Sequence, residues 1–484
     1  MEENKVVISK MDNPENGYLG KTPFYPPKIY PELLNLNITI KKDENNQVYE
    51  AVRNAFLLMK MDRKHIGTSS WNPLSEIIKN GDTVVLKPNF VIDKNINDRA
   101  CGSTITHGSV IRAIIDYVLI ALNGSGKIVV ADAPQMNCNF DNLIKKNGME
   151  GVAEYYKREL KDSDIDFELL DLRREKTIFK NGVVWERIPL KGDPRGYTVI
   201  DLKKDSEFYG MDPKNFYGAD YNRAQTVKAH SKGHHKYFIS NTVLQSDVII
   251  SIPKLKVHRK TGVTLNLKNM VGINGDKNYL VHYQVGTRSK GGDEFLIDSK
   301  IANVDRKIMD WTVGRNWKYG KYLYVGYLKC KKMLDIVDKK NIGGGDWWGN
   351  DTTWRMAVDI NKILLYSDKN GKLTSERKRR YLALIDGIIG GEGEGPLCTR
   401  PVKSGVIILG SNPIASDFVG TLYMGVDYKK LKIFTEKFKG RKKLKTFSFH
   451  DIIINSTEHQ YDELLTKNCL TYKYDVPSGW KGYL

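Results

Sequence analysis

Strand-like apolar runs alternate with helical segments along residues 81–173, and this alternation constrains the fold more than any other feature. The runs at 81–91, 123–134 and 166–173 are rich in aliphatic residues, whereas 106–122 and 140–160 carry apolar residues at helical spacing. Further strands are predicted after residues 246, 380 and 402. Strands that alternate with helices predict an α/β fold with mostly parallel sheets flanked by helices and an irregular insertion. In such sheets, ligands bind beyond the carboxyl ends of the strands.

The length of 484 residues is too great for one small core and fits either two domains or one large α/β domain with insertions. Residues 174–245 are less regular and more polar, with a hairpin predicted around Asn181 and Gly182. We expect an extended, proline-rich arm at 1–45, an α/β lobe with an irregular excursion at 46–245, a second α/β lobe at 246–428 that contains an insertion at 300–345, and a basic segment at 429–484.

Composition limits the partners and the compartment. The net charge of +19 favours anionic partners, although lysines spread over an ordinary basic surface would give the same number. Five cysteines without short spacing argue against a disulfide framework and against a cysteine-rich zinc or iron–sulfur motif. The sequence contains neither an 18-residue apolar run nor a signal-peptide pattern, so we expect a cytoplasmic protein without a transmembrane segment.

Cationic residues cluster directly after the predicted strand at 246–253. Lys254, Lys256 and His258 alternate with apolar residues, so an extended backbone would place all three on one face. Lys268 and Asn269 follow with a charge and an amide. The side chains of Lys254, Lys256 and His258 at a strand end suit a phosphate or carboxylate ligand. The alternative is that these charged residues form an ordinary solvated surface. Further ligand-binding candidates are Gly272, which permits close backbone approach, and Lys87 and Asn89 at the end of the strand at 81–91.

Acidic candidates lie farther along the chain. The predicted loop at 386–396 carries Asp386 and Glu392 among glycines, which suits a divalent metal site, a general base or only a flexible turn. Asp417 either reaches the same pocket or favours the start of a helix. The His230–His235 cluster includes the spacing of a helical metal site, but no carboxylate ligand accompanies it.

Four segments resemble the family called domain of unknown function 362 (DUF362): residues 84–91, 246–272, 384–396 and 405–425. The resemblance implies oxidoreductase or isomerase chemistry, since many relatives carry an iron–sulfur domain and serve anaerobic redox metabolism. This chain has no CxxCxxC run, so a built-in cluster is not expected. Members without the cluster resemble products encoded near surface-polysaccharide genes. The family is also similar to the N-terminal domain of lactate racemase, but the nickel ligands of that enzyme are not carried over.

We therefore expect a cytoplasmic enzyme that acts on a phosphorylated sugar or a carboxylate, with redox or isomerisation chemistry linked to surface polysaccharides. The catalytic candidates are His258, Lys256, Glu392 and Asp386; the ligand-binding candidates are Lys87, Asn89, Lys254, Lys268, Asn269, Gly272 and Asp417. The sequence does not identify a cofactor, and a divalent metal ion is one candidate. The alternative is a non-catalytic basic protein on a membrane or nucleic acid, although no nucleic-acid motif is present. The aromatic and basic residues at 300–345 suit a membrane interface or an extra packed subdomain.

Overall fold

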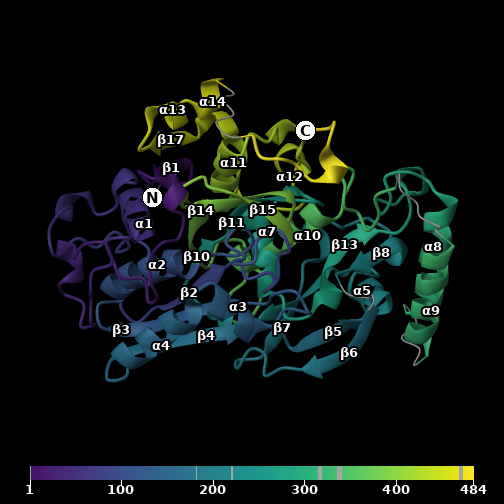
Figure 1. The fold of residues 1–484 in the computed structure, drawn as a ribbon, viewed down its shortest axis with the longest axis horizontal. Helices are drawn as coiled ribbons and strands as arrows, with labels where there is room; N and C mark the ends of the chain where they lie inside the picture. The colour runs from purple at the N-terminus through teal and green to yellow at the C-terminus, as the bar shows by residue number, and fades with distance from the viewer. Residues whose placement is uncertain (1, 181–182, 220–221, 314–318, 335–340, 468–472) are drawn as a thin grey trace.

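The computed structural model describes residues 2–180, 183–219, 222–313, 319–334, 341–467 and 473–484. A mixed sheet of eleven strands, counted over these residues, forms its centre (Figure 1). Its strands are β1 (Lys5–Lys10), β2 (Thr83–Pro88), β3 (Ser125–Asp132), β4 (Asp164–Asp171), β10 (Val248–Ile252), β11 (Lys254–His258), β12 (Gly262–Val263), β14 (Arg380–Glu394), β15 (Cys398–Val402), β16 (Val406–Gly410) and β17 (Ile453–Ser456). The order is β17-β1-β16-β14-β10-β2-β3-β4, with β11 and β15 also paired to β14.

The strands β14, β10, β2, β3 and β4 are parallel to one another, whereas β16 is antiparallel to both of its neighbours. The predicted α/β fold with a mostly parallel sheet is confirmed. The sheet takes strands from each of the four segments expected from the sequence, because β1 comes from 1–45 and β17 from 429–484.

Helices cover both faces of this sheet. Alternate residues of one strand therefore enter different cores: Val84 lies in one core and Val85 in the other. The first core is completed by α1 (Gln47–Leu58), α2 (Gly108–Leu122), α3 (Phe140–Lys146) and α4 (Met149–Glu159). The second is completed by α7 (Leu265–Asn269), α10 (Thr353–Tyr366) and α11 (Pro413–Tyr423).

Smaller elements surround the sheet. Three two-stranded ribbons pair β5 (Glu175–Lys180) with β6 (Val183–Pro189), β7 (Tyr197–Asp201) with β9 (Lys236–Ser240), and β8 (Phe216–Gly218) with β13 (Val281–Gln284). The predicted turn at Asn181 and Gly182 falls outside the described residues. The remaining α-helices are α5 (Arg223–Ala229), α6 (Asn241–Leu244), α8 (Lys300–Thr312), α9 (Gly320–Met333), α12 (Lys432–Thr435), α13 (His459–Asp462) and α14 (Leu464–Lys467). No helix within the described ranges is long and apolar enough to cross a membrane.

Three segments differ from the expectation. The arm at 1–45 contributes β1, whose hydrogen-bonded neighbours β16 and β17 are more than 390 residues away in sequence. The single helix expected at 140–160 is two helices, because Gly148 takes a positive φ of 79° and ends the first. The glycine loop expected at 386–396 is instead mostly strand, since β14 continues to Glu394. Its glycines permit close packing: a Cβ atom on Gly387 would approach both Leu255 and Val406 to 2.8 Å.

Candidate functional site

A cavity of about 510 Å³ lies beyond the carboxyl ends of β2, β3 and β11, where an α/β sheet places its ligands. More than half of the residues that line it are polar or charged. The polar and charged residues that line it are Asn89, Asp132, Gln135, Lys256, His258, Arg259, Lys260, Thr264, Lys268, Asn269, Lys277, His282 and Asp346. The structure thus brings together five residues predicted from the sequence, namely Lys256, His258, Lys268, Asn269 and Asn89, and places Gly272 beside them.

A buried ion pair forms the base of this cavity. Lys87, at the end of β2, lies 2.8 Å from Asp132, at the end of β3, and both side chains are almost fully buried. The Asn269 amide donates to the Lys87 carbonyl oxygen at 2.8 Å, and so holds α7 against β2. Gly272 lies directly over the pair, because a Cβ atom there would collide with the Asp132 carboxylate. Lys87 therefore supports the cavity and does not line it.

Three cavity lysines, Lys256, Lys268 and Lys277, have no carboxylate within ion-pair distance among the described residues. The fully buried Lys256 donates only to backbone carbonyl oxygens, including that of Pro396 at 3.2 Å. Burial lowers the pKa of all three ammonium groups, to about 7 for Lys268 and about 8 for Lys277, and neighbouring cations add to the shift. A bound anion would stabilise the protonated form of these lysines and raise their pKa values again. The wall is therefore suited to a negatively charged ligand.

Two histidines in the wall are held in opposite tautomers by the backbone. Nδ1 of His258 accepts a hydrogen bond from the Lys260 N–H at 3.0 Å, so the proton of the neutral ring is on Nε2. Nδ1 of His282 lies 3.1 Å from the Leu280 carbonyl oxygen and must donate, which leaves a lone pair on Nε2. Burial and the nearby lysines lower the pKa of both imidazoles well below the usual value, so both rings are neutral. Nε2 of His258 can therefore donate a hydrogen bond, and Nε2 of His282 can accept a proton.

The two carboxylates of the wall are already neutralised. Asp132 is paired with Lys87, and Asp346 lies 2.7 Å from Lys260 and 3.5 Å from Arg259. The charge balance of the cavity is therefore positive whenever its lysines are protonated. This balance favours an anion over a cation or a neutral ligand.

The other predicted site residues lie outside this cavity. Lys254 and Asp386 pair with each other at 2.9 Å, fully buried, because the register of β11 on β14 shifts between Lys254 and Lys256. Glu392 accepts hydrogen bonds from Arg400 and from the Asp475 N–H on the surface. Asp417 accepts the N–H groups of Asn266 and Leu267 at the start of α7, and burial raises its pKa to about 7. Asp417 thus positions the helix that carries Lys268.

Sequence reasoning missed Lys277 and His282. Each belongs to a short element, a 3-10 turn at Lys277–Tyr279 and strand β13, that follows the recognised segment at 246–272. The available signal was the alternation in Leu280–Gln284, which places His282 and Gln284 on one face of a strand.

The histidine cluster near residue 230 does not form a recognisable metal site. His230 is buried with Nε2 2.9 Å from the Tyr279 carbonyl oxygen, and His234 is paired with Asp201 on the surface. In the described part of the chain, no three His, Cys, Asp or Glu side chains are grouped to hold a metal ion.

The family model described as "Domain of unknown function (DUF362)" matches residues 84–187 and 199–421, which is more than half of the chain. The matched ranges include β2, β3, β11, α7 and β13, and hence every strand and helix that supplies the cavity. No curated protein matches the chain.

Proposed function

The chain belongs to the DUF362 family, and from the cavity we propose that it is an enzyme that binds an anionic small molecule and moves a proton on it. The observation that carries the proposal is the convergence of three carboxylate-free lysines and two neutral histidines of opposite tautomer on one wall. Since the family description names no activity, the proposal rests on the residues alone.

Lys256, Lys268 and Lys277 are the groups that would hold the anion. Each ammonium pays a desolvation cost in the free protein, and a phosphate or carboxylate oxygen would offset it with a charge-assisted hydrogen bond. A cavity of about 510 Å³ suits a ligand the size of a phosphorylated sugar or a small polycarboxylate. The side-chain oxygen of Asn89, which is buried without a hydrogen-bond partner among the described residues, adds a neutral acceptor that can orient a hydroxyl group.

His282 and His258 are the groups that would carry out the proton transfer. The His282 Nε2 lone pair takes a proton from carbon next to the anionic group and returns it to a neighbouring carbon, while the neutral His258 donates a hydrogen bond from Nε2–H to the oxygen on which negative charge develops. One base and one hydrogen-bond donor perform an isomerisation without net redox change. Free thiols at all four described cysteines suit a reducing compartment, so we propose that the reaction takes place in the cytoplasm.

Anion binding is tested with phosphate, citrate and glucose 6-phosphate against glucose, by thermal shift and calorimetry. Lys268→Met should weaken binding of the anions about tenfold or more, since a hydrogen bond to a charged group contributes about 1.5–3 kcal/mol. The matched control is Lys161→Met, an exposed lysine that forms no ion pair with a described residue. If Lys268→Met and the control variant bound the anions with equal affinity, the proposed anion site would be wrong.

Proton transfer is tested by incubating phosphorylated sugars and 2-hydroxy acids with the protein in D₂O and following C–H signals by NMR. His282→Gln should abolish deuterium incorporation and keep anion affinity, whereas His450→Gln, at an exposed histidine, should change neither. Exchange at an unchanged rate in His282→Gln would contradict the assigned base. Anion binding with no exchange on any of these compounds would contradict an enzymatic role and leave a binding protein.

A further inference from the structure

Exposed apolar side chains gather on the segment at 297–334. Of the nineteen large apolar side chains that are exposed among the described residues, nine come from this segment. They are Ile297, Ile301, Val304, Trp311, Tyr319, Tyr322, Leu323, Met333 and Leu334. Met333 is 86% exposed and Leu334 is 70% exposed. Because the segment is short relative to the chain, this surface differs from the scattered apolar residues of an ordinary protein surface.

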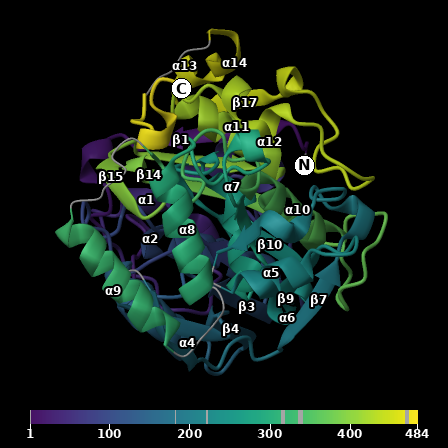
Figure 2. The ribbon, with the colours of Figure 1, turned by 90° about the vertical axis from the view of Figure 1, so that its right-hand side faces the viewer.

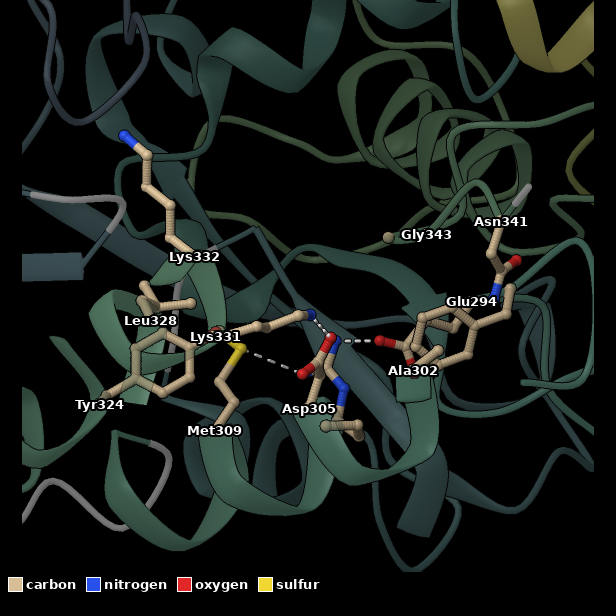
Figure 3. A pocket seen from close by; sticks show the side chains of 13 residues that line it. Glu294, Ala302, Asp305, Met309, Tyr324, Leu328, Lys331, Lys332, Asn341 and Gly343 are labelled. Carbon is tan, nitrogen blue, oxygen red and sulfur yellow. Dashed lines mark hydrogen bonds and ion pairs between the residues drawn. The ribbon is translucent and has the colours of Figure 1, made fainter. Parts of the chain in front are cut away.

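The segment folds as a hairpin of α8 and α9 at one end of the molecule (Figures 1 and 2). No described residue from 297–334 belongs to either hydrophobic core. Ion pairs and one aromatic contact attach the hairpin instead: Arg306 pairs with Glu294, Asp310 lies 3.1 Å from Arg223, and Tyr322 packs edge-on against Trp185. A hollow of about 510 Å³ lies under the hairpin (Figure 3). The exposed apolar residues therefore do not serve the core.

The hairpin carries an excess of positive charge that no carboxylate among the described residues neutralises. All three of its acidic residues are paired: Asp298 with Lys290, Asp305 with Lys331, and Asp310 with Arg223. Figure 3 shows Lys331 turned toward Asp305, whereas Lys332 points away from both. Five lysines have no carboxylate partner in the described ranges: Lys321, which donates to the Trp185 carbonyl oxygen, and Lys300, Lys307, Lys329 and Lys332. The surface thus combines free positive charge with exposed apolar groups.

Lysines and apolar residues share the same outer stripes. On α8, the exposed residues Ile301, Val304, Lys307 and Trp311 follow helical spacing. On α9, the exposed residues Tyr322, Lys329, Cys330 and Met333 do the same. An aromatic ring and a lysine stem are each apolar along their length and polar at the tip, so both are stable where hydrocarbon meets lipid headgroups. Helices of this kind lie in the plane of a membrane surface.

We propose that the α8–α9 hairpin binds the surface of an anionic bilayer. Met333, Leu334 and Trp311 enter the boundary between headgroups and acyl chains, while Lys329 and Lys332 contact lipid phosphates. Each lysine near such a surface adds about 1 kcal/mol of attraction. The hairpin stands at the edge of the molecule (Figure 1) and carries apolar side chains among lysines, which a fluid bilayer can surround one by one. The proposal is independent of the chemistry assigned to the cavity.

The test is co-sedimentation of the full chain with vesicles of phosphatidylcholine alone or with 30% phosphatidylglycerol. We expect sedimentation with the anionic vesicles at low salt and little with the neutral ones. The double variants Met333→Ser/Leu334→Ser and Lys329→Glu/Lys332→Glu should each weaken vesicle binding about thirtyfold or more, as two lost contacts of this size predict. All four side chains are exposed, so the variants should fold normally.

Matched controls separate the hairpin from the overall charge of +19. Leu34→Ser removes another side chain that is 68% exposed, and Lys161→Glu reverses another exposed lysine. Both should leave vesicle binding unchanged. No sedimentation with anionic vesicles would overturn the proposal, as would an equal loss in controls and hairpin variants. Capture by immobilised polyglutamate without vesicle binding would point to an acidic protein and would also overturn it.

Discussion

The ammonium group of Lys254 lies 2.9 Å from the carboxylate of Asp386, and neither side chain is exposed to solvent. The same carboxylate accepts the His107 N–H at 3.0 Å and the hydroxyl of Tyr18, whose ring stacks on His107. The pair therefore joins the N-terminal segment, α2 and β14. Both residues were predicted from the sequence to contact a ligand. In the structure their charged groups pair with each other instead.

We predict that Asp386→Asn destabilises the protein by about 3–5 kcal/mol, because it leaves the Lys254 ammonium buried without its counter-charge. Urea denaturation measures this loss. Anion affinity at a temperature where the variant is folded should change less than twofold, since neither residue lines the cavity. The double variant Lys254→Met/Asp386→Leu should recover much of the stability. A folded Asp386→Asn protein that no longer binds anions would contradict this structural role.

We predict that anion affinity falls as pH rises from 7 to 9. Lys268 and Lys277 bind the anion when protonated, and their pKa values in the free protein are about 7 and about 8. Calorimetry with phosphate in two buffers should also show proton uptake on binding at pH 8, because the anion raises both pKa values. Lys268→Met should reduce that uptake. Affinity that rises with pH would contradict the assignment.

The same two lysines affect the stability of the free protein in the opposite direction. Their pKa values in the folded state are below the ordinary lysine value of 10.5, so above pH 7 the unfolded chain binds more protons than the folded one. Stability from these groups therefore rises with pH between about 7 and 10.5, and Lys268→Met should lessen the rise. Urea denaturation of both proteins at pH 7, 8 and 9 measures it, and identical slopes would contradict the burial of Lys268.

We predict that Gly272→Ala disrupts the base of the cavity. The added Cβ atom would lie 2.8 Å from the Lys87 ammonium and closer still to the Asp132 carboxylate, so the ion pair must separate. Overpacking of this kind costs about 1–3 kcal/mol, and anion binding should weaken because Lys268 and Asn269 move with the chain. Gly326→Ala, on the exposed side of α9 with open space around it, is the matched control. Unchanged thermal stability in Gly272→Ala would show that the contact is not close.

We predict that Asp417→Ala loses about 1–2 kcal/mol, the usual cost of removing a side chain that accepts N–H groups at a helix start. Anion affinity should fall only modestly, because Asp417 positions α7 and contacts no part of the cavity. Asp427→Ala is the control, since Asp427 accepts a single N–H group at an exposed 3-10 turn. A fold-preserving loss of all anion binding would instead place Asp417 in the site.

Local sequence patterns were sufficient for β2, β3 and β10, whose apolar runs are buried on both faces, and for the face shared by Lys256 and His258. They were insufficient where distant pairing decides the structure. The glycines of β14 resemble a loop until Leu255 and Val406 are seen to fill the space around Gly387. His282 reaches the cavity only because β13 pairs with β8, which no pattern near residue 282 reveals.

The position of β1 has a consequence for synthesis on the ribosome. This strand lies between β16 and β17, whose residues are translated more than 390 positions later. At ribosomal rates of about 5–20 residues per second, Val6, Val7 and Ile8 wait tens of seconds for the strands that will bury them. Strand β1 can therefore pair with β16 and β17 only after both have been made.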